Sequence, residues 1–109
     1  MAARPPGKEA PLVLPVALLL LATAHFLDYT TFLLMIGRHG LEAELNPLAV
    51  FIIERTGLLG LTVAKASAVL LAGASAMIII RRRRTLAGVV LGFGIAIGML
   101  GAFSNVLTI

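Results

Sequence analysis

The 109-residue chain contains no cysteine, and charged residues make up only 13% of it, against 60% for hydrophobic residues. Without cysteine, neither a disulfide framework nor a thiolate metal site can form, and thiol chemistry is excluded. So small a share of charge in so apolar a chain does not suit the water-exposed surface of a soluble domain. The composition therefore predicts a membrane protein whose main partner is the lipid bilayer.

The formal net charge of +4 does not indicate a nucleic-acid partner. Four of the nine basic residues form a single block, Arg81 to Arg84, between two apolar segments. A basic block in that position is typical of a short cytoplasmic connection between membrane spans. We therefore expect no nucleic acid among the partners.

Three long apolar runs follow one another along the chain, at about residues 12–36, 58–80 and 86–107. At about 1.5 Å per residue, a helix of this length crosses about 30 Å of hydrocarbon with some tilt. The predicted fold class is all-α, an integral membrane bundle of three transmembrane helices. Residues 1–11 are expected to form a cytoplasmic N-terminal tail, and residues 12–109 a single helical membrane domain.

The N-terminal region admits a second interpretation, a secretory signal peptide. Arg4 and Lys8, the leucines that follow and the Ala-Thr-Ala of residues 22–24 would suit a signal cleaved before His25. The apolar character continues past that site as far as Ile36, whereas a mature protein normally begins with polar sequence. An uncleaved membrane anchor fits better.

The loop between the first two runs contains the signals of a short helix. Asn46 suits an N-cap, Pro47 the first helical position and Gly57 a C-terminal stop. A helix over about residues 47–56 is about 15 Å long, too short to span a bilayer. Its apolar start and charged end predict a helix that lies in the membrane interface.

Polar residues of this first loop are candidates for a site at the outer face: His39, Glu42, Glu44, Asn46 and Pro47. The two glutamates precede the N-cap, where carboxylates favour the positive end of a helix. Solvated charge near that helix end is the simplest interpretation of both. Whether His25 and the glutamates converge on the charges inside the membrane is left open.

The distribution of basic residues predicts the orientation of the chain. Arg4 and Lys8 flank the first span, and the arginine block joins the second span to the third. Both sets can be cytoplasmic at once, whereas the loop between the first two spans is net acidic and suits the outer face. We expect a multi-pass protein of the cell membrane with a cytoplasmic N-terminus and an external C-terminus.

Two charged residues lie inside the apolar runs. Asp28 is eight residues before the end of the first run, and Lys65 is seven residues after the start of the second. At about 1.5 Å per residue, both lie roughly 10 to 12 Å below the outer boundary, on adjacent antiparallel helices. Each charge alone costs about 2.5 to 3.5 kcal/mol near a helix centre, so we predict an intramembrane ion pair. The alternative is a snorkelling Lys65 beside a protonated, hydrogen-bonded Asp28.

Further polar and small residues accompany this pair. His25 lies one helical turn from Asp28 on the same side of the first span. The third span carries small residues at helical spacing with an amide at the outer end: Gly94, Gly98, Gly101 and Asn105. We expect this stripe, and a stripe of alanines at positions 64, 68, 72 and 76, to be helix-packing seams. The candidate intramembrane polar cluster comprises His25, Asp28, Thr31, Lys65 and Asn105.

The central part of the chain resembles a family of small prokaryotic membrane proteins known as the domain of unknown function 5658. In that family an aspartate in the first span is followed by threonine, a Glu-x-Asn-Pro-like turn and a lysine in the next span. The resemblance covers about residues 24–75, and the matching positions are Asp28, Thr31, Glu44, Asn46, Pro47 and Lys65. Because the family has no assigned activity, the resemblance implies a compact helical membrane fold and little about mechanism.

Three classes of function fit these residues. The first is a structural or accessory membrane protein, in which the ion pair sets helix register and the glycine stripe drives homo-oligomerisation or pairing with another membrane protein. The second is a proton or small-ion pathway, because ionisable groups inside a membrane often mark such pathways. The third is a membrane enzyme with a metal or acid/base centre at the outer face.

The residues favour the first class. A pathway would find no titratable group deeper in the membrane than His25. An enzyme would draw on side chains that are competent metal ligands, namely His25, Asp28, His39, Glu42 and Glu44. No His-Glu-x-x-His helix, nucleophile elbow or phosphate loop accompanies them. We therefore predict no catalytic residues, no cofactor and no metal site, although enzymatic activity remains open.

Overall fold

The computed structural model describes residues 10–109. In this part of the chain, the elements are α1 (Ala10–His39), the short 3-10 helix η1 (Leu41–Ala43), α2 (Pro47–Ile79) and α3 (Arg84–Thr108). Each of the three α-helices is long and apolar enough to cross a membrane, and residues 10–109 include no strand. The predicted fold class, an all-α bundle of three membrane-length helices, is confirmed.

Helix α1 is longer than the sequence pattern indicates. It begins at Ala10, two residues before the expected start, and continues to His39, three residues beyond the expected end. Gly37 stays helical, and the helix ends at Gly40, whose φ of 79° lies in the left-handed region that glycine adopts without strain. The rest of the predicted N-terminal tail, residues 1–9, lies outside the described residues.

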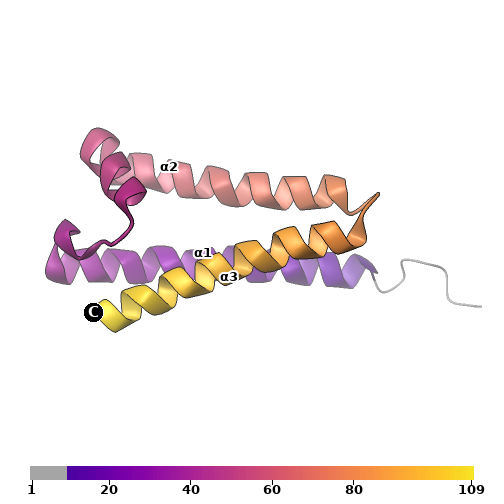
Figure 1. Ribbon diagram of the computed structural model, residues 1–109, viewed down its shortest axis with the longest axis horizontal. Coiled ribbons are helices and arrows are strands. Elements are labelled where there is room, and N and C mark those ends of the chain that lie inside the picture. The colour runs from indigo at the N-terminus through magenta and orange to yellow at the C-terminus, as the bar shows by residue number, and fades with distance from the viewer. Residues whose placement is uncertain (1–9) are drawn as a thin grey trace, which may run out of the picture.

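Helix α2 contains a break that divides it into two parts. Asn46 caps its start by accepting a hydrogen bond from the backbone N–H of Leu48 at 3.0 Å, and Pro47 is the first helical residue. Gly57 has φ 76° and ψ −175°, which is not helical. The short helix predicted over residues 47–56 is therefore present, and in Figure 1 it runs across the long axis of the bundle at one end.

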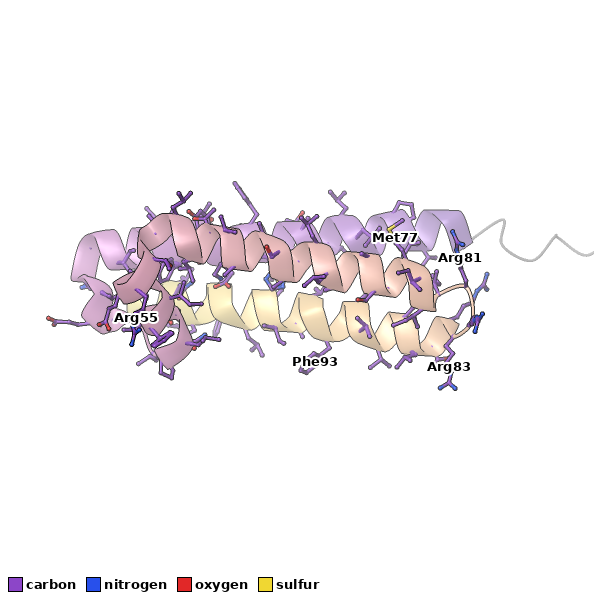
Figure 2. The ribbon with its side chains drawn as sticks, turned by 90° about the horizontal axis from the view of Figure 1, so that it is seen from above. Arg55, Met77, Arg81, Arg83 and Phe93 are labelled. Carbon is purple, nitrogen blue, oxygen red and sulfur yellow. The ribbon has the colours of Figure 1, made fainter. Side chains whose placement is uncertain are left out.

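The two ends of the bundle differ in composition. Arg81 and Arg83 lie in the connection between α2 and α3, whereas Arg55 lies at the opposite end, near the break in α2 (Figure 2). The end with Arg55 also holds η1, the short first part of α2 and the last turn of α3 (Figure 1). We call it the loop end, and the other the arginine end.

Most large apolar side chains lie on the outside of the bundle. Leu59, Leu70 and Leu107 are each more than 70% exposed, and the 67% exposed Phe93 points away from α3 in Figure 2. Apolar surface on this scale is unfavourable in water but is covered by lipid chains in a bilayer. The packing thus supports the membrane assignment that the composition predicts.

Helices α1 and α3 pack most closely, because glycines of α3 face α1. A Cβ atom on Gly94 would lie 2.8 Å from the Leu21 side chain, and one on Gly98 would lie 3.0 Å from the backbone of Ala24. Such distances are too short for ordinary contacts, so the two backbones approach closely only because α3 has glycine there. Helix α2 is the least buried of the three, and its alanine stripe is covered only in part, since Ala68 is exposed.

Candidate functional site

Asp28 lies on the face of α1 that is shared by both other helices. Its Oδ2 accepts a hydrogen bond from Lys65 Nζ of α2 at 2.5 Å. Its Oδ1 accepts from Asn105 Nδ2 of α3 at 3.1 Å. The side chains of Asp28 and Lys65 are 15% and 27% exposed, so the ion pair is mostly removed from the surface. One carboxylate therefore joins α1 to α2 and to α3; we call these three residues the Asp28 junction.

Asn105 contributes more than one hydrogen bond to the junction. Its Nδ2 also lies 3.0 Å from the backbone carbonyl oxygen of Asp28 and 3.1 Å from Thr31 Oγ1, so its two N–H groups are shared among three acceptors. The backbone carbonyl oxygen and Oδ1 of Asp28 can only accept. The Asn105 amide nitrogen must therefore face them, and the amide oxygen must point elsewhere. Asn105 is the one buried polar residue of the described chain, at 7% exposed.

Gly101 provides the space that the Asp28 carboxylate occupies. A Cβ atom on Gly101 would lie 2.5 Å from Asp28 Oδ1 and 2.7 Å from Asp28 Cγ. The sequence pattern identifies Gly101 only as part of a packing stripe. In the structure it has the additional effect of admitting the carboxylate next to the α3 backbone.

A second polar contact joins α1 to α2 one residue further along α1. Tyr29 Oη lies 2.6 Å from Thr62 Oγ1. Thr62 donates its hydroxyl proton to the Leu58 carbonyl at 2.9 Å, so Tyr29 is the donor to Thr62. Thr62 is not among the site residues predicted from the sequence. Its position one turn before Lys65 does indicate that both residues lie on the same face of α2.

His25 takes part in the α1–α3 contact instead of the Asp28 junction. Its Nε2 lies 2.9 Å from the Gly94 carbonyl oxygen. Because a carbonyl oxygen only accepts, this geometry requires a proton on Nε2, and His25 is the donor. His25 therefore acts as a hydrogen-bonded packing residue between two helices.

The outer-loop candidates do not converge on the Asp28 junction as a group. His39 Nε2 donates to the Ile109 carbonyl at 2.9 Å, joining the end of α1 to the end of α3. Glu42 is exposed on η1. Among residues 10–109, no three His, Asp or Glu side chains come together in a way that would hold a metal ion. The outer-loop side chains are thus not gathered into a metal-ligand set in the part of the chain that the structure describes.

Glu44 and Asn46 form the entrance to α2. Glu44 Oε1 accepts a hydrogen bond from the backbone N–H of Asn46 at 2.9 Å, and Asn46 in turn caps Leu48. Pro47 supplies the first helical position and no functional group. Glu44 differs from Glu42 because its side chain also reaches the cavity beside Asp28.

A cleft of about 360 Å³ opens at the loop end beside the Asp28 junction. Its walls come from α1, the entrance to α2, the longer part of α2 and the last turns of α3. Its polar lining consists of Asp28, Glu44, Asn46, Lys65, Ser104 and Asn105. Its apolar lining includes Phe32, Leu61 and Ile97. We call it the outer cleft.

Comparison with known proteins adds no relative from which a role could be inferred. No protein family model, no curated protein and no solved structure matches this chain. The resemblance to the domain of unknown function 5658 accordingly remains a prediction from the residue pattern.

Proposed function

We propose that the chain is a structural or accessory protein of the cell membrane, in which the Asp28 junction fixes three spans in register for assembly with a second copy or another membrane protein. The observation that carries this proposal is that the charges inside the bundle satisfy one another. Asp28 accepts hydrogen bonds on both carboxylate oxygens, from Lys65 and from Asn105. Groups that are bonded in this way serve to hold helices together.

Helix α2 depends most on the Asp28 junction for its register relative to the other helices. Lipid chains are as apolar as leucine, so apolar contact gives little preference for one helix register over another inside a bilayer. Helix α2 is also the least buried of the membrane-length helices. The Asp28–Lys65 and Tyr29–Thr62 contacts supply the register that its apolar surface does not specify.

The proposal includes an orientation in the membrane. The arginine end carries the basic block and would face the cytoplasm, together with the N-terminus. The loop end would face outward with the C-terminus, and the short helix over residues 47–56 would lie in the outer interface. The separation of Arg81 and Arg83 from the loop end in Figure 2 agrees with this orientation.

A proton or small-ion pathway is the second candidate, and the outer cleft is the observation that favours it. The cleft reaches Asp28 and Lys65 from the loop end. Between this level and the arginine end, His25 is the one titratable side chain of the described residues, and it donates to a backbone carbonyl. A pathway would therefore require another subunit to continue it.

Proton flux distinguishes the two candidates. Purified protein in liposomes with an internal pH dye and an imposed potential is expected to leak protons no faster than empty liposomes. The Asp28→Asn variant should behave in the same way. A leak that the wild type shows and Asp28→Asn abolishes would favour the pathway and contradict the structural role.

A positive test of assembly uses the exposed surface of α2. Leu70 is 72% exposed at membrane depth. A photo-crosslinking amino acid at this position, activated in intact membranes, should give a discrete protein adduct, either a dimer or a heteromer. Labelling of lipid alone, from Leu70 and from the 67% exposed Leu100 of α3, would contradict assembly.

A further inference from the structure

The outer cleft has the volume of a small-ligand site. Its volume of about 360 Å³ lies within the range of about 300 to 1,000 Å³ that is usual for small-molecule pockets. It lies between helices, and each of the three α-helices contributes both polar and apolar lining residues. The structural role proposed above makes no use of this space.

The charges that line the cleft do not balance. Asp28 and Lys65 neutralise each other at 2.5 Å, which leaves the Glu44 carboxylate as the net charge. The positive end of α2 does not offer an anion site, because Glu44 Oε1 already accepts from the Asn46 N–H there. An anionic ligand would meet Glu44 without a free cation to oppose it, so the cleft favours a cation.

Two acceptor oxygens on residues that line the cleft remain open. Glu44 Oε2 and Asn105 Oδ1 receive no hydrogen bond from residues 10–109, although Asn105 is only 7% exposed and lines the cleft. A primary ammonium group presents three N–H donors and no acceptor, which matches a carboxylate oxygen and an amide oxygen. Ca²⁺ takes about six to eight oxygen ligands and Mg²⁺ about six, whereas the cleft offers one unpaired carboxylate and one open amide oxygen.

The apolar part of the lining suits the short hydrocarbon chain attached to that ammonium. Phe32 and Leu61 are each 3% exposed, so their side chains are held in place by packing. Together with Ile97 of α3 they form the apolar surface of the cleft. We propose that the outer cleft binds a primary ammonium group carried on a short carbon chain, with the ammonium between Glu44 and Asn105. This group is common to free alkylamines and to the headgroup of phosphatidylethanolamine, in which two carbons join it to the phosphate.

Binding is measured on ¹⁵N-labelled protein in a neutral maltoside detergent, which brings no ammonium of its own. n-Butylammonium chloride is titrated at constant ionic strength while the Asn105 side-chain amide and the Asn46 backbone amide are followed by NMR. Saturable shifts at both positions are expected, and sodium butyrate should give none. Equal shifts with butyrate, or no saturation with any ammonium ligand, would overturn the proposal.

The matched variants are Glu44→Gln and Glu42→Gln. Glu44→Gln keeps an oxygen to accept from Asn46 but removes the charge, so affinity should fall at least about tenfold. Glu42 has the same charge two residues earlier and is exposed outside the cleft, so Glu42→Gln should change affinity less than about twofold. An equal effect of the two variants would assign the binding to general surface charge and contradict the site.

A second variant tests the cleft by volume. Ser104 is exposed at the edge of the cleft, so Ser104→Leu fills part of the space without disturbing the buried α1–α3 contact. It should weaken butylammonium binding at least about fivefold. Retained affinity would place the ligand elsewhere.

A lipid titration separates the two sources of the ligand. Short-chain phosphatidylethanolamine is compared with short-chain phosphatidylglycerol, which has the same tails and no amine. Tighter, Glu44-dependent binding of phosphatidylethanolamine than of butylammonium assigns the site to the headgroup, and the reverse assigns it to a free amine. Equal binding of the two lipids, unaffected by Glu44→Gln, would exclude the lipid headgroup as the ligand.

Discussion

Asn105 donates to the carboxylate of Asp28 across 77 positions of sequence, with its Nδ2 3.1 Å from Asp28 Oδ1. The same carboxylate accepts from Lys65. An aspartate that would be costly alone in lipid is therefore neutralised from α2 and hydrogen-bonded from α3. If this junction holds the bundle together, each of its members has a distinct and measurable effect.

Replacing Asn105 tests the contribution of α3. Asn105→Ala removes every donor to Asp28 Oδ1 from this helix and should lower the free energy of unfolding by about 1 to 3 kcal/mol. Asn105→Asp should be more damaging, because it sets two carboxylates against each other. Thermal unfolding in detergent measures both, and Ser104→Ala, at the exposed neighbouring position, is the control that should stay close to wild type.

Substitution of Gly101, which lies against Asp28, can be compared with substitution of Gly92, which lies in open space. Gly101→Ala places a methyl group 2.5 Å from Asp28 Oδ1 and should destabilise the protein by about 1 to 3 kcal/mol. Gly92→Ala makes the same change on the same helix, where nothing lies within 4 Å, and should be neutral or slightly stabilising. Equal melting temperatures for the two variants would show that Gly101 does not make room for the carboxylate.

Tyr29 and Thr62 are expected to act as a pair. Tyr29→Phe and Thr62→Val each remove one side of the 2.6 Å contact and should cost about 0.6 kcal/mol, the average for interhelical hydrogen bonds in membranes. The double variant should cost no more than either single one. Additive losses would mean that the two hydroxyl groups contribute separately.

The orientation is tested by reporter fusions after residues 45, 83 and 109. The distribution of basic residues predicts cytoplasmic reporter activity at 83 and external activity at 45 and 109. Cytoplasmic activity at 45 or 109 would reverse the assignment and place the outer cleft on the inner side.

Counting along the sequence predicts the depth of a residue but not the direction in which it points. The equal depth of Asp28 and Lys65 follows from the fixed rise of a helix, and the N-cap at Asn46 and the stop at Gly57 follow from local backbone chemistry. The rotation of α3, which brings Asn105 to Asp28, depends on close glycine packing against α1. That packing is a tertiary property. The sequence therefore places Asn105 in the polar cluster but does not predict that its amide donates to Asp28.

The outer cleft and the contacts of the two histidines also depend on tertiary packing, which the sequence pattern does not predict. His25 and His39 are candidate functional residues in the sequence, yet His25 donates to a backbone carbonyl of α3 and His39 to the main-chain oxygen of Ile109, directly after α3. Which main-chain oxygen each histidine reaches depends on how α1 and α3 pack against each other. Hydropathy does not separate Glu42 from Glu44; in the structure Glu42 lies in η1 and is exposed, whereas Glu44 follows η1 and lines the cleft.

The most direct test of the Asp28 junction is a double-mutant cycle on its ion pair. Asp28→Ala and Lys65→Leu each leave a charge inside the membrane-spanning bundle without its partner and should cost about 3 to 5 kcal/mol in the free energy of unfolding in detergent. The double variant removes both charges and should be far less destabilised than the sum of the single variants, which gives a large coupling energy. Additive losses would contradict the junction, because they would show that Asp28 and Lys65 stabilise the bundle independently.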